Sequence, residues 1–293
     1  GSASTHLKVN DNLTLSGIAL ETGAGSLSLS GALALTDNAS LNSSGGTITL
    51  VSGASAPSGT SISLPDTTLV LQNALSLTGA TLKTKNTTFT TNANALSLSN
   101  SSFLEVEGTQ NLSGVVPDGT STLRLTADAS INDSAALSVG TLDLSNFALT
   151  LNNAMAGLSI AQPVTLDAAG EKILTGAADL SLNGGISATA GTLSSTGGTL
   201  SLPIGATLAT GASFSTSNTT LNLGGSLAVA DTWTSTSTSV SLTTDNASLS
   251  HSNTNPLSLA SLQTNGYDFE LASVTSDLTI ENAFALSVGE TLS

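Results

Sequence analysis

The sequence contains no cysteine, two histidines and only five basic residues, and aromatic side chains make up 3% of it. Without cysteine, disulfide bonds and thiolate metal sites are excluded. Charged residues account for 9% of the chain, against about 25% in a typical globular domain. Few side chains are therefore suited to acid–base or nucleophilic chemistry. We expect a protein that is not an enzyme and that has no catalytic, cofactor-binding or metal-binding residues.

The charge balance is strongly acidic, with a formal net charge of −15 at neutral pH. The basic residues are scattered along the sequence: Lys8, Lys83, Lys85, Arg124 and Lys172. Because no basic patch is evident to neutralise phosphates, nucleic acid and anionic membranes are not expected partners. No apolar run approaches the roughly 18 residues of a membrane helix, so this segment is not expected to insert into a membrane.

What the chain does contain is hydrophobic residues in a regular pattern. The apolar fraction is 39%, which is enough for a core, whereas disordered chains combine low hydrophobicity with high net charge. The recurring unit is Leu-x-Leu, as in Leu13-Thr-Leu15, Leu27-Ser-Leu29 and Leu200-Ser-Leu202. Alternation with a period of two predicts a strand with one buried face. Gly, Asn, Asp or Ser follows each unit, as expected of a turn.

The spacing of these units predicts the fold. Neighbouring units begin about seven residues apart, and every third unit recurs after about 20–22 residues, for example from 13 to 33 and from 193 to 214. Strands this short, with corners of about two residues, cannot reverse into hairpins but can close a three-sided coil. A fixed period of this length is typical of a solenoid, in which each coil buries its apolar face against the next.

We therefore predict an all-β protein that forms a single parallel β-helix, a three-sided β-solenoid of about 20–22 residues per coil and about 13 coils. It is expected to run continuously over residues 3–293, with corner loops near 51–61 and 112–122. Gly1-Ser2 resembles a cleavage scar from expression, and Gly289-Glu-Thr-Leu-Ser293 stops in mid-pattern, so we expect a fragment of a longer chain. The main alternative is a string of small antiparallel β-sandwiches, which the period of seven and the rarity of aromatic residues disfavour.

The two histidines are the first candidates for chemistry. His251 lies between Ser250 and Ser252, and a nucleophilic serine requires a neighbouring base and an orienting carboxylate. Because serine is abundant throughout the chain, this adjacency is expected by chance, and we interpret His251 as a surface residue on a corner. His6 lies near the end of the chain and is a weaker candidate.

Paired carboxylates occur twice, at Glu105 and Glu107 and at Asp268 and Glu270. Each pair lies on one face of a strand, where it could begin a calcium site or an acid–base pair. The simpler interpretation, which we prefer, is a solvated outer face.

The segment Thr232–Ser239 alternates Thr and Ser around the only tryptophan, Trp233. Flat threonine rows can bind ice, but an ice-binding surface repeats Thr-x-Thr on every coil, and this chain does not. We interpret the segment as ordinary outer strand positions and Trp233 as part of the core. Asn-x-Ser/Thr sequons are about as frequent as chance predicts and give no indication of glycosylation; examples are Asn12, Asn38, Asn86 and Asn218.

The repeated Leu-x-Leu units with Asn and Gly at the turns, over the whole chain, resemble bacterial surface β-solenoids, namely filamentous-haemagglutinin-like adhesins and autotransporter passengers. The Asn-Pro-Asn-Leu secretion motif of such proteins has only a faint counterpart in Asn253-Thr-Asn-Pro256. The resemblance implies a location outside the cell or on the bacterial outer surface, and a non-catalytic role in adhesion, in biofilm or as an extended stalk.

The implied partners are other copies or neighbouring segments of the same fibre, and host or surface glycans or proteins. The alternative functions are a self-assembling extracellular filament or sheath subunit and, more remotely, ice binding.

Overall fold

A computed structural model describes residues 5–91, 95–132, 135–152, 157–245, 247–274 and 277–285. It is an all-β structure in which parallel sheets stack as a β-solenoid of about 13 turns, so the predicted fold class is confirmed. Within these residues no helix is long and apolar enough to cross a membrane. Gly1, Ser2 and the C-terminal Gly289–Ser293 segment lie outside the described residues. The chain divides into two compact units, residues 1–145 and 146–293, and each is described by itself.

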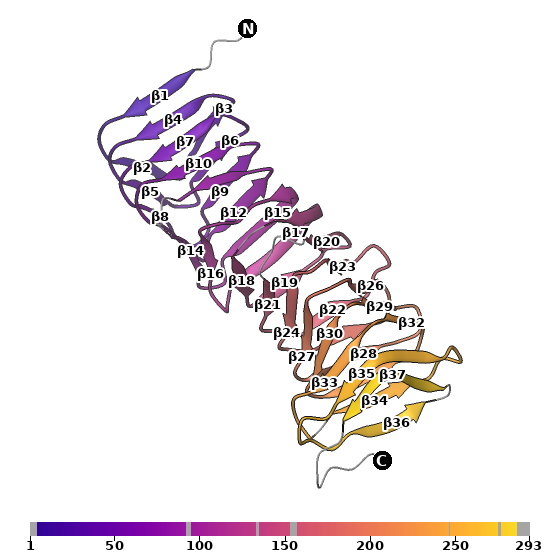
Figure 1. Ribbon diagram of the computed structural model, residues 1–293. Coiled ribbons are helices and arrows are strands. Elements are labelled where there is room, and N and C mark those ends of the chain that lie inside the picture. The colour runs from indigo at the N-terminus through magenta and orange to yellow at the C-terminus, as the bar shows by residue number, and fades with distance from the viewer. Residues whose placement is uncertain are drawn as a thin grey trace. The chain divides into compact units, whose positions relative to one another are not determined.

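Unit 1 has three sheets, and the chain visits them in turn (Figure 1). Sheet 1 consists of β1 (His6–Val9), β4 (Ser26–Leu29), β7 (Thr47–Leu50), β10 (Thr68–Leu71) and β13 (Thr88–Thr90). Sheet 2 consists of β2 (Leu13–Ser16), β5 (Leu33–Thr36), β8 (Ala54–Ala56), β11 (Leu75–Thr78), β14 (Leu96–Ser99) and β16 (Val115–Pro117). Sheet 3 consists of β3 (Ala19–Gly23), β6 (Ser40–Ser43), β9 (Ser61–Pro65), β12 (Thr81–Lys85), β15 (Phe103–Gln110), β17 (Thr122–Ile131) and β19 (Thr141–Asp143); β18 (Ala136–Val139) follows β17 in the chain.

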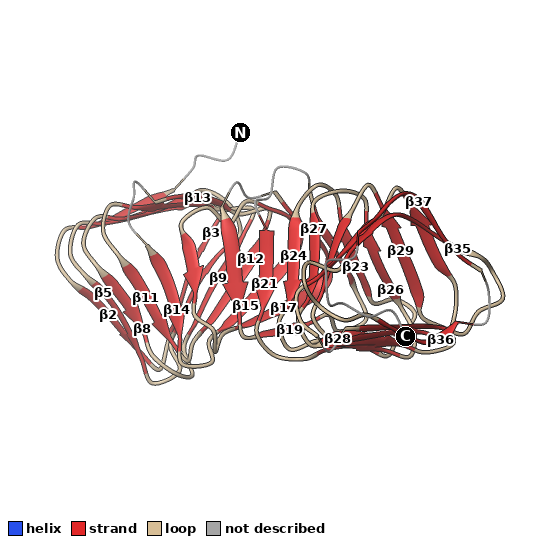
Figure 2. Cartoon of the chain, turned by 60° about the horizontal axis from the view of Figure 1, so that its bottom comes forward, coloured by secondary structure: helices blue, strands red, loops and turns tan. Residues whose placement is uncertain are grey.

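In unit 2 the chain again visits three rows of strands in turn (Figure 2), and the strands of each row that lie in this unit are numbered here as sheets 4 to 6. Sheet 4 consists of β20 (Ala148–Leu151), β23 (Lys172–Thr175), β26 (Thr192–Ser195), β29 (Ser213–Ser217) and β32 (Trp233–Thr236). Sheet 5 consists of β21 (Gly157–Ile160), β24 (Asp179–Leu182), β27 (Thr199–Leu202), β30 (Thr220–Leu223), β33 (Ser239–Leu242), β35 (Leu257–Gln263) and β37 (Leu278–Ala285). Sheet 6 consists of β22 (Val164–Leu166), β25 (Ile186–Ala188), β28 (Gly205–Leu208), β31 (Ser226–Val229), β34 (Ser248–His251) and β36 (Glu270–Val274).

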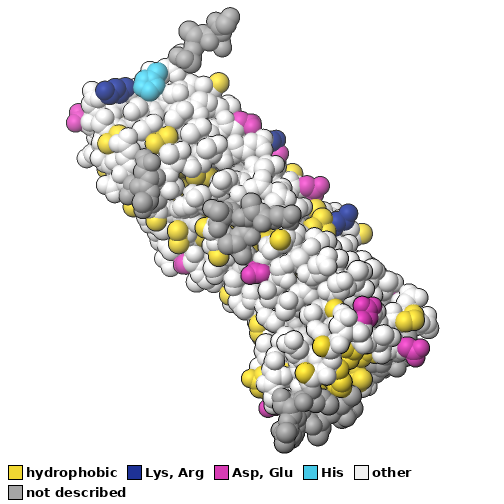
Figure 3. Space-filling view, viewed as in Figure 1, with side chains coloured by type: hydrophobic (Ala, Val, Ile, Leu, Met, Phe, Trp, Pro, Cys, Tyr) yellow, Lys and Arg dark blue, Asp and Glu magenta, His cyan; other side chains and the backbone are white. Residues whose placement is uncertain are grey.

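Strand pairing explains why the Leu-x-Leu units recur at a fixed period. β4 pairs with β7 and β7 pairs with β10 in parallel, which places Leu27, Ile48 and Leu69 side by side in one column. All three side chains are at most 1% exposed. Within each of these strands, the residues that alternate with the buried ones point outward and are mostly Ser and Thr. Figure 3 shows a visible face with few charged side chains. The strand pairs of the described residues are parallel, so the antiparallel-sandwich alternative is wrong.

The corners use a short recurring motif. Asp66 and Asn86 adopt positive φ angles of 52° and 48°, a left-handed conformation that Asn and Asp tolerate better than most residues. The residue after each is a buried threonine: the Thr67 hydroxyl donates to the Pro65 carbonyl (2.9 Å) and the Thr87 hydroxyl donates to the Leu64 carbonyl (2.5 Å). The side chain thus satisfies a backbone acceptor inside the corner, where water is excluded.

The two predicted corner loops are not simple loops. The 51–61 segment contains β8, whose Ala54 and Ala56 point inward while Ser55 is exposed. The 112–122 segment contains β16, in which Val115 and Pro117 are buried and Val116 is 53% exposed. Both segments keep the alternation of a strand, but the inward residues are small or include proline instead of leucine. The sequence pattern was therefore too weak for us to recognise them as strands.

Candidate functional site

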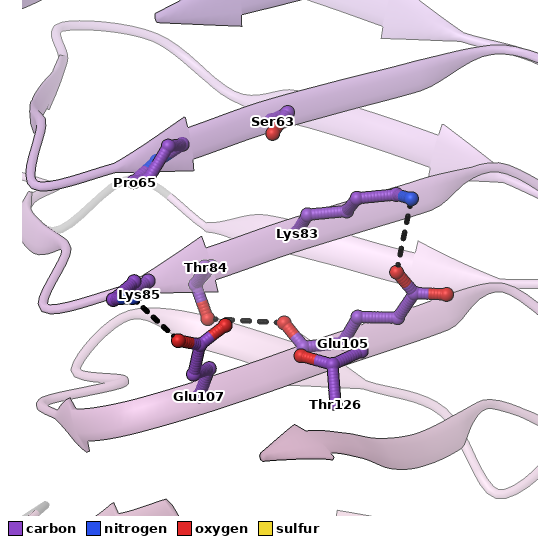
Figure 4. A pocket seen from close by; sticks show the side chains of 8 residues that line it. All are labelled: Ser63, Pro65, Lys83, Thr84, Lys85, Glu105, Glu107 and Thr126. Atoms are coloured by element: carbon purple, nitrogen blue, oxygen red, sulfur yellow. Dashed lines mark hydrogen bonds and ion pairs between the residues drawn. The ribbon is translucent and has the colours of Figure 1, made fainter. Parts of the chain in front are cut away.

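The most distinctive group of side chains in the described residues lies on the outer face of sheet 3 in unit 1 (Figure 4). We call it the charged cluster, and it consists of Lys83, Lys85, Glu105, Glu107, Arg124 and Asp143. The residues come from the adjacent strands β12, β15, β17 and β19, and each points away from the core because it alternates with a buried aliphatic or threonine side chain. Three cations and three carboxylates face one another, so the formal charges of the cluster balance.

Glu105 is the centre of the cluster. Its carboxylate lies 3.3 Å from Lys83 Nζ and 3.6 Å from Arg124 Nη1, and its side chain is 12% exposed. Arg124 Nε also donates to Asp143 Oδ2 at 2.8 Å, so that one guanidinium connects two carboxylates on neighbouring strands. A second pair, Lys85 Nζ and Glu107 Oε1, is 2.5 Å apart and about a third to a half exposed. The result is a row of ion pairs across four strands.

Hydrogen bonding favours the ionised forms of Lys85 and Asp143. The hydrogen bond and charge of Glu107 raise the pKa of Lys85. For Asp143, partial burial alone would raise the carboxyl pKa, but hydrogen bonds from Ser145 and Arg124 outweigh it, and the pKa is lowered. At neutral pH both residues are therefore fully charged, which does not suit either of them to proton transfer.

A shallow cavity of about 280 Å³ lies beside the ion pairs. It is lined by the four charged side chains of β12 and β15 together with Pro65 and Thr126. The Arg124 guanidinium does not face it freely, because it lies 4.3 Å from the centre of the Phe103 ring. The cavity offers amine donors and carboxylate acceptors side by side, an arrangement suited to contact with a polar, uncharged surface and not to a single strong charge.

The cluster corrects our expectation that the basic residues are scattered, because three of the five lie together. The repeat period could have revealed this cluster, because residues one turn apart in the sequence lie on neighbouring strands. Register places Lys83 beside Glu105, Glu105 beside Arg124, and Arg124 beside Asp143, each one turn further along the chain. Glu105 and Glu107 do lie on an outer strand face, as predicted, but they are paired with cations and not simply solvated. Among the described residues, no group of three or more His, Asp or Glu is placed to hold a metal ion.

His251 is not the surface residue that we predicted. It is the last residue of β34, is 1% exposed, and pairs in register with Val229 of β31, so it occupies an inward, otherwise apolar column. Burial disfavours the charged imidazolium and lowers the pKa of His251. The prediction was wrong because it assumed that the strand ends before the histidine, whereas β34 (Ser248–His251) includes it. His6 is exposed on β1.

The carboxylates of Asp268 and Glu270 lie on either side of the buried Phe269. Both residues are exposed, which agrees with the outer face that we expected. The Asp268 backbone N–H donates to Asp245 Oδ1 at 3.2 Å, so the nearby acid serves as a backbone acceptor.

Trp233 belongs to the core, as predicted. It is 4% exposed, its ring centre lies 5.1 Å from that of Phe214, and its Nε1 donates to Thr216 Oγ1 at 2.9 Å. The outward column beside it runs through Ser215 and Thr234 and thus mixes serine with threonine.

The four sequon asparagines named above as examples lie at exposed corner positions: Asn12, Asn38, Asn86 and Asn218. Several of them use their side chains to hold the corners together. The Asn86 amide donates to Asp66 Oδ1 at 3.0 Å and accepts from the Thr109 backbone N–H at 3.2 Å, which links three successive turns.

Comparison of the chain with protein-family models, with curated proteins and with solved structures finds no match.

Proposed function

We propose that this chain is a non-catalytic segment of a fibrous protein, secreted or displayed on a bacterial cell surface, that acts as an extended stalk or takes part in adhesion or biofilm. The observation that carries the proposal is the uniform stacking of turns: inward leucine columns alternate with outward serine and threonine in the described strands of both units. Each added turn extends such a stack by about 4.8 Å. A sequence built in this way converts chain length into reach.

The outer surface supports the same role. Exposed serine and threonine hydroxyls can form hydrogen bonds with water and with neighbouring strands, so they provide little driving force for non-specific association. The acidic net charge of −15 opposes non-specific aggregation of the chain. Against this background the charged cluster is the most chemically distinct surface among the described residues, and it is the first place to test for adhesive contact with a polar glycan or protein.

The first experiment is immunogold labelling of intact source cells with an antibody against this segment. The proposal predicts label on the cell exterior or in the surrounding matrix. Label confined to the cytoplasm of permeabilised cells would contradict it.

The second experiment separates adhesion from a stalk role. The purified chain is tested for binding to intact cells and to a glycan array, beside the double variant Lys83→Ser with Lys85→Ser and the control Lys172→Ser. Saturable binding that the double variant loses and the control keeps supports adhesion through the charged cluster. Absence of binding by all three proteins assigns the segment to the stalk.

A further inference from the structure

Four residues of the charged cluster form a single column of alternating charge along the outer face of sheet 3. Register pairs Lys83 of β12 with Glu105 of β15. It likewise pairs Glu105 with Arg124 of β17, and Arg124 with Asp143 of β19. From β12 to β19 the column is therefore positive, negative, positive and negative, with about 4.8 Å between neighbouring strands. Its formal charges cancel, on a chain whose net charge is −15, so a second copy can approach this column with little net repulsion.

Most of the column is accessible to a partner. The side chains of Lys83, Arg124 and Asp143 are 52%, 36% and 37% exposed, whereas Glu105 lies deeper. The ion pairs within the chain do not exhaust these groups, because ammonium and guanidinium groups carry several N–H donors and a carboxylate accepts several hydrogen bonds. Each of the three exposed side chains can therefore form a further contact outside its own chain.

The alternation makes the column complementary to itself when its direction is reversed. Consider a two-fold axis in the plane of a face-to-face contact, parallel to the strands and midway between β15 and β17. Lys83 of each copy then faces Asp143 of the other, and Glu105 of each copy faces Arg124 of the other. Two columns that run in the same direction without an offset would instead place like charges opposite each other at every position. Charge thus selects the antiparallel arrangement.

We propose that two copies of this chain associate side by side through the charged cluster, in antiparallel orientation. Such an interface is isologous, because each copy contributes the same surface, and the pair closes as a dimer. The partner is a second copy of this chain. This step goes beyond the stalk or adhesion role proposed above, and it holds whether or not the cluster also contacts a glycan.

The dimer should be weak and sensitive to salt. The column extends about 14 Å from β12 to β19, so the buried area lies well below the roughly 800 Å² per partner of a typical stable interface. We expect a dissociation constant on the order of 0.1 mM. At about 0.1 M salt, charges more than about 10 Å apart are largely screened, so the repulsion between the net charges fades while charges in contact still attract. About 1 M salt should dissociate the dimer, because it screens the contacts as well.

The test is sedimentation equilibrium of the purified chain at about 0.1 M salt, over concentrations that span the expected dissociation constant. The wild type is expected to pass from monomer to dimer and no further. Lys83→Glu and Asp143→Lys each place two pairs of like charges across the two-fold axis, so each variant should dimerise about tenfold more weakly, or worse. Lys172→Glu makes the same change of charge at an exposed position of β23 and should leave dimerisation unchanged.

A mixture of the two cluster variants tests the antiparallel pairing directly. Across the two-fold axis, the carboxylate introduced in place of Lys83 faces the ammonium introduced in place of Asp143, and the unchanged Asp143 faces the unchanged Lys83. An equal mixture should therefore regain an affinity close to that of the wild type, as a heterodimer, although neither variant dimerises well alone. Circular dichroism and thermal unfolding check that every variant remains folded.

Three results would overturn the proposal. The first is a wild type that stays monomeric over the whole concentration range. The second is dimerisation that both cluster variants retain. The third is a mixture that dimerises no better than its components, since Lys83 then does not face Asp143. The measurement contains no cells and no glycan, so none of these results bears on the adhesion role, which has its own experiment.

Discussion

Leu200 and Ser201 provide a direct comparison of the two faces of one strand. Leu200 of β27 is 0% exposed and lies between Leu180 and Leu221 in a leucine column, whereas Ser201 is the next residue and points outward between Ser181 and Asn222. Substituting aspartate at either position adds the same side chain, one residue apart. Any difference in stability therefore reports the direction in which the side chain points.

The magnitude follows from what each position buries. Leu200→Ala removes three buried carbon atoms, worth about 0.8 kcal/mol each, and leaves a cavity, so a loss of about 2–5 kcal/mol is expected. Leu200→Asp adds the penalty of a buried, unpaired carboxylate and should exceed that of the alanine variant. Because such a loss approaches the total stability of many domains, this variant is expected to unfold several neighbouring turns. Ser201→Asp should cost less than about 0.5 kcal/mol.

The assay is urea unfolding followed by circular dichroism, with hydrogen exchange to locate the turns that open. The order of stability should be wild type and Ser201→Asp together, then Leu200→Ala, then Leu200→Asp. Equal losses for the two aspartate variants, or a larger loss for Ser201→Asp, would refute the inward and outward assignment.

Three further predictions concern single side chains. His251→Val should remove a source of acid sensitivity. The folded-state pKa of His251 lies below its usual value of about 6.5, so unfolding takes up a proton as the pH falls through 6.5, and below that pH the wild type should lose stability relative to the variant. A stability difference that stays constant between pH 8 and pH 5 would exclude this. Arg124→Gln removes an ion-pair partner of Glu105 and Asp143, so the free energy of unfolding should fall by about 1 kcal/mol at low salt and by less at high salt. Denaturant titrations at two ionic strengths measure this, and a loss of stability that is independent of salt would argue against an ion-pair role. Trp233→Phe keeps the aromatic packing but loses the hydrogen bond to a buried threonine, so the melting temperature should fall by an amount worth about 1–2 kcal/mol, and an unchanged value would contradict that bond.

The fold could be predicted from the sequence because the solenoid is a local rule applied many times. Each Leu-x-Leu unit specifies a strand with one buried face, and the period of about 20–22 residues specifies which units stack. Trp233 could be placed in the core for the same reason, since it lies where the leucine of a unit would be. The rule lost its signal where inward residues were not leucine, as at Ala54 and Ala56 of β8.

The charged cluster and His251 were missed for two different physical reasons. The cluster is formed by residues one turn apart, so Lys83, Glu105 and Arg124 look unrelated when charges are counted along the sequence and become neighbours only when the register is known. His251 was misplaced because a polar residue in an apolar column contradicts the pattern from which burial was inferred. A single exception of this kind cannot be recognised from alternation alone.

The central claim is that successive turns stack in parallel and in register, and the absence of cysteine makes it directly testable by cross-linking. Ser181→Cys combined with Ser201→Cys places two thiols on register partners of adjacent turns, at about 4.8 Å between strands, within the range that a disulfide spans. Ser181→Cys combined with Asn222→Cys places them two turns apart, at about 9.6 Å, which is too far. The measurement is the fraction of intramolecular disulfide formed under mild oxidation by the folded chain. Rapid and nearly complete cross-linking of the first pair with little of the second is the predicted result. Equal cross-linking of both pairs, or of neither, would contradict the parallel stack.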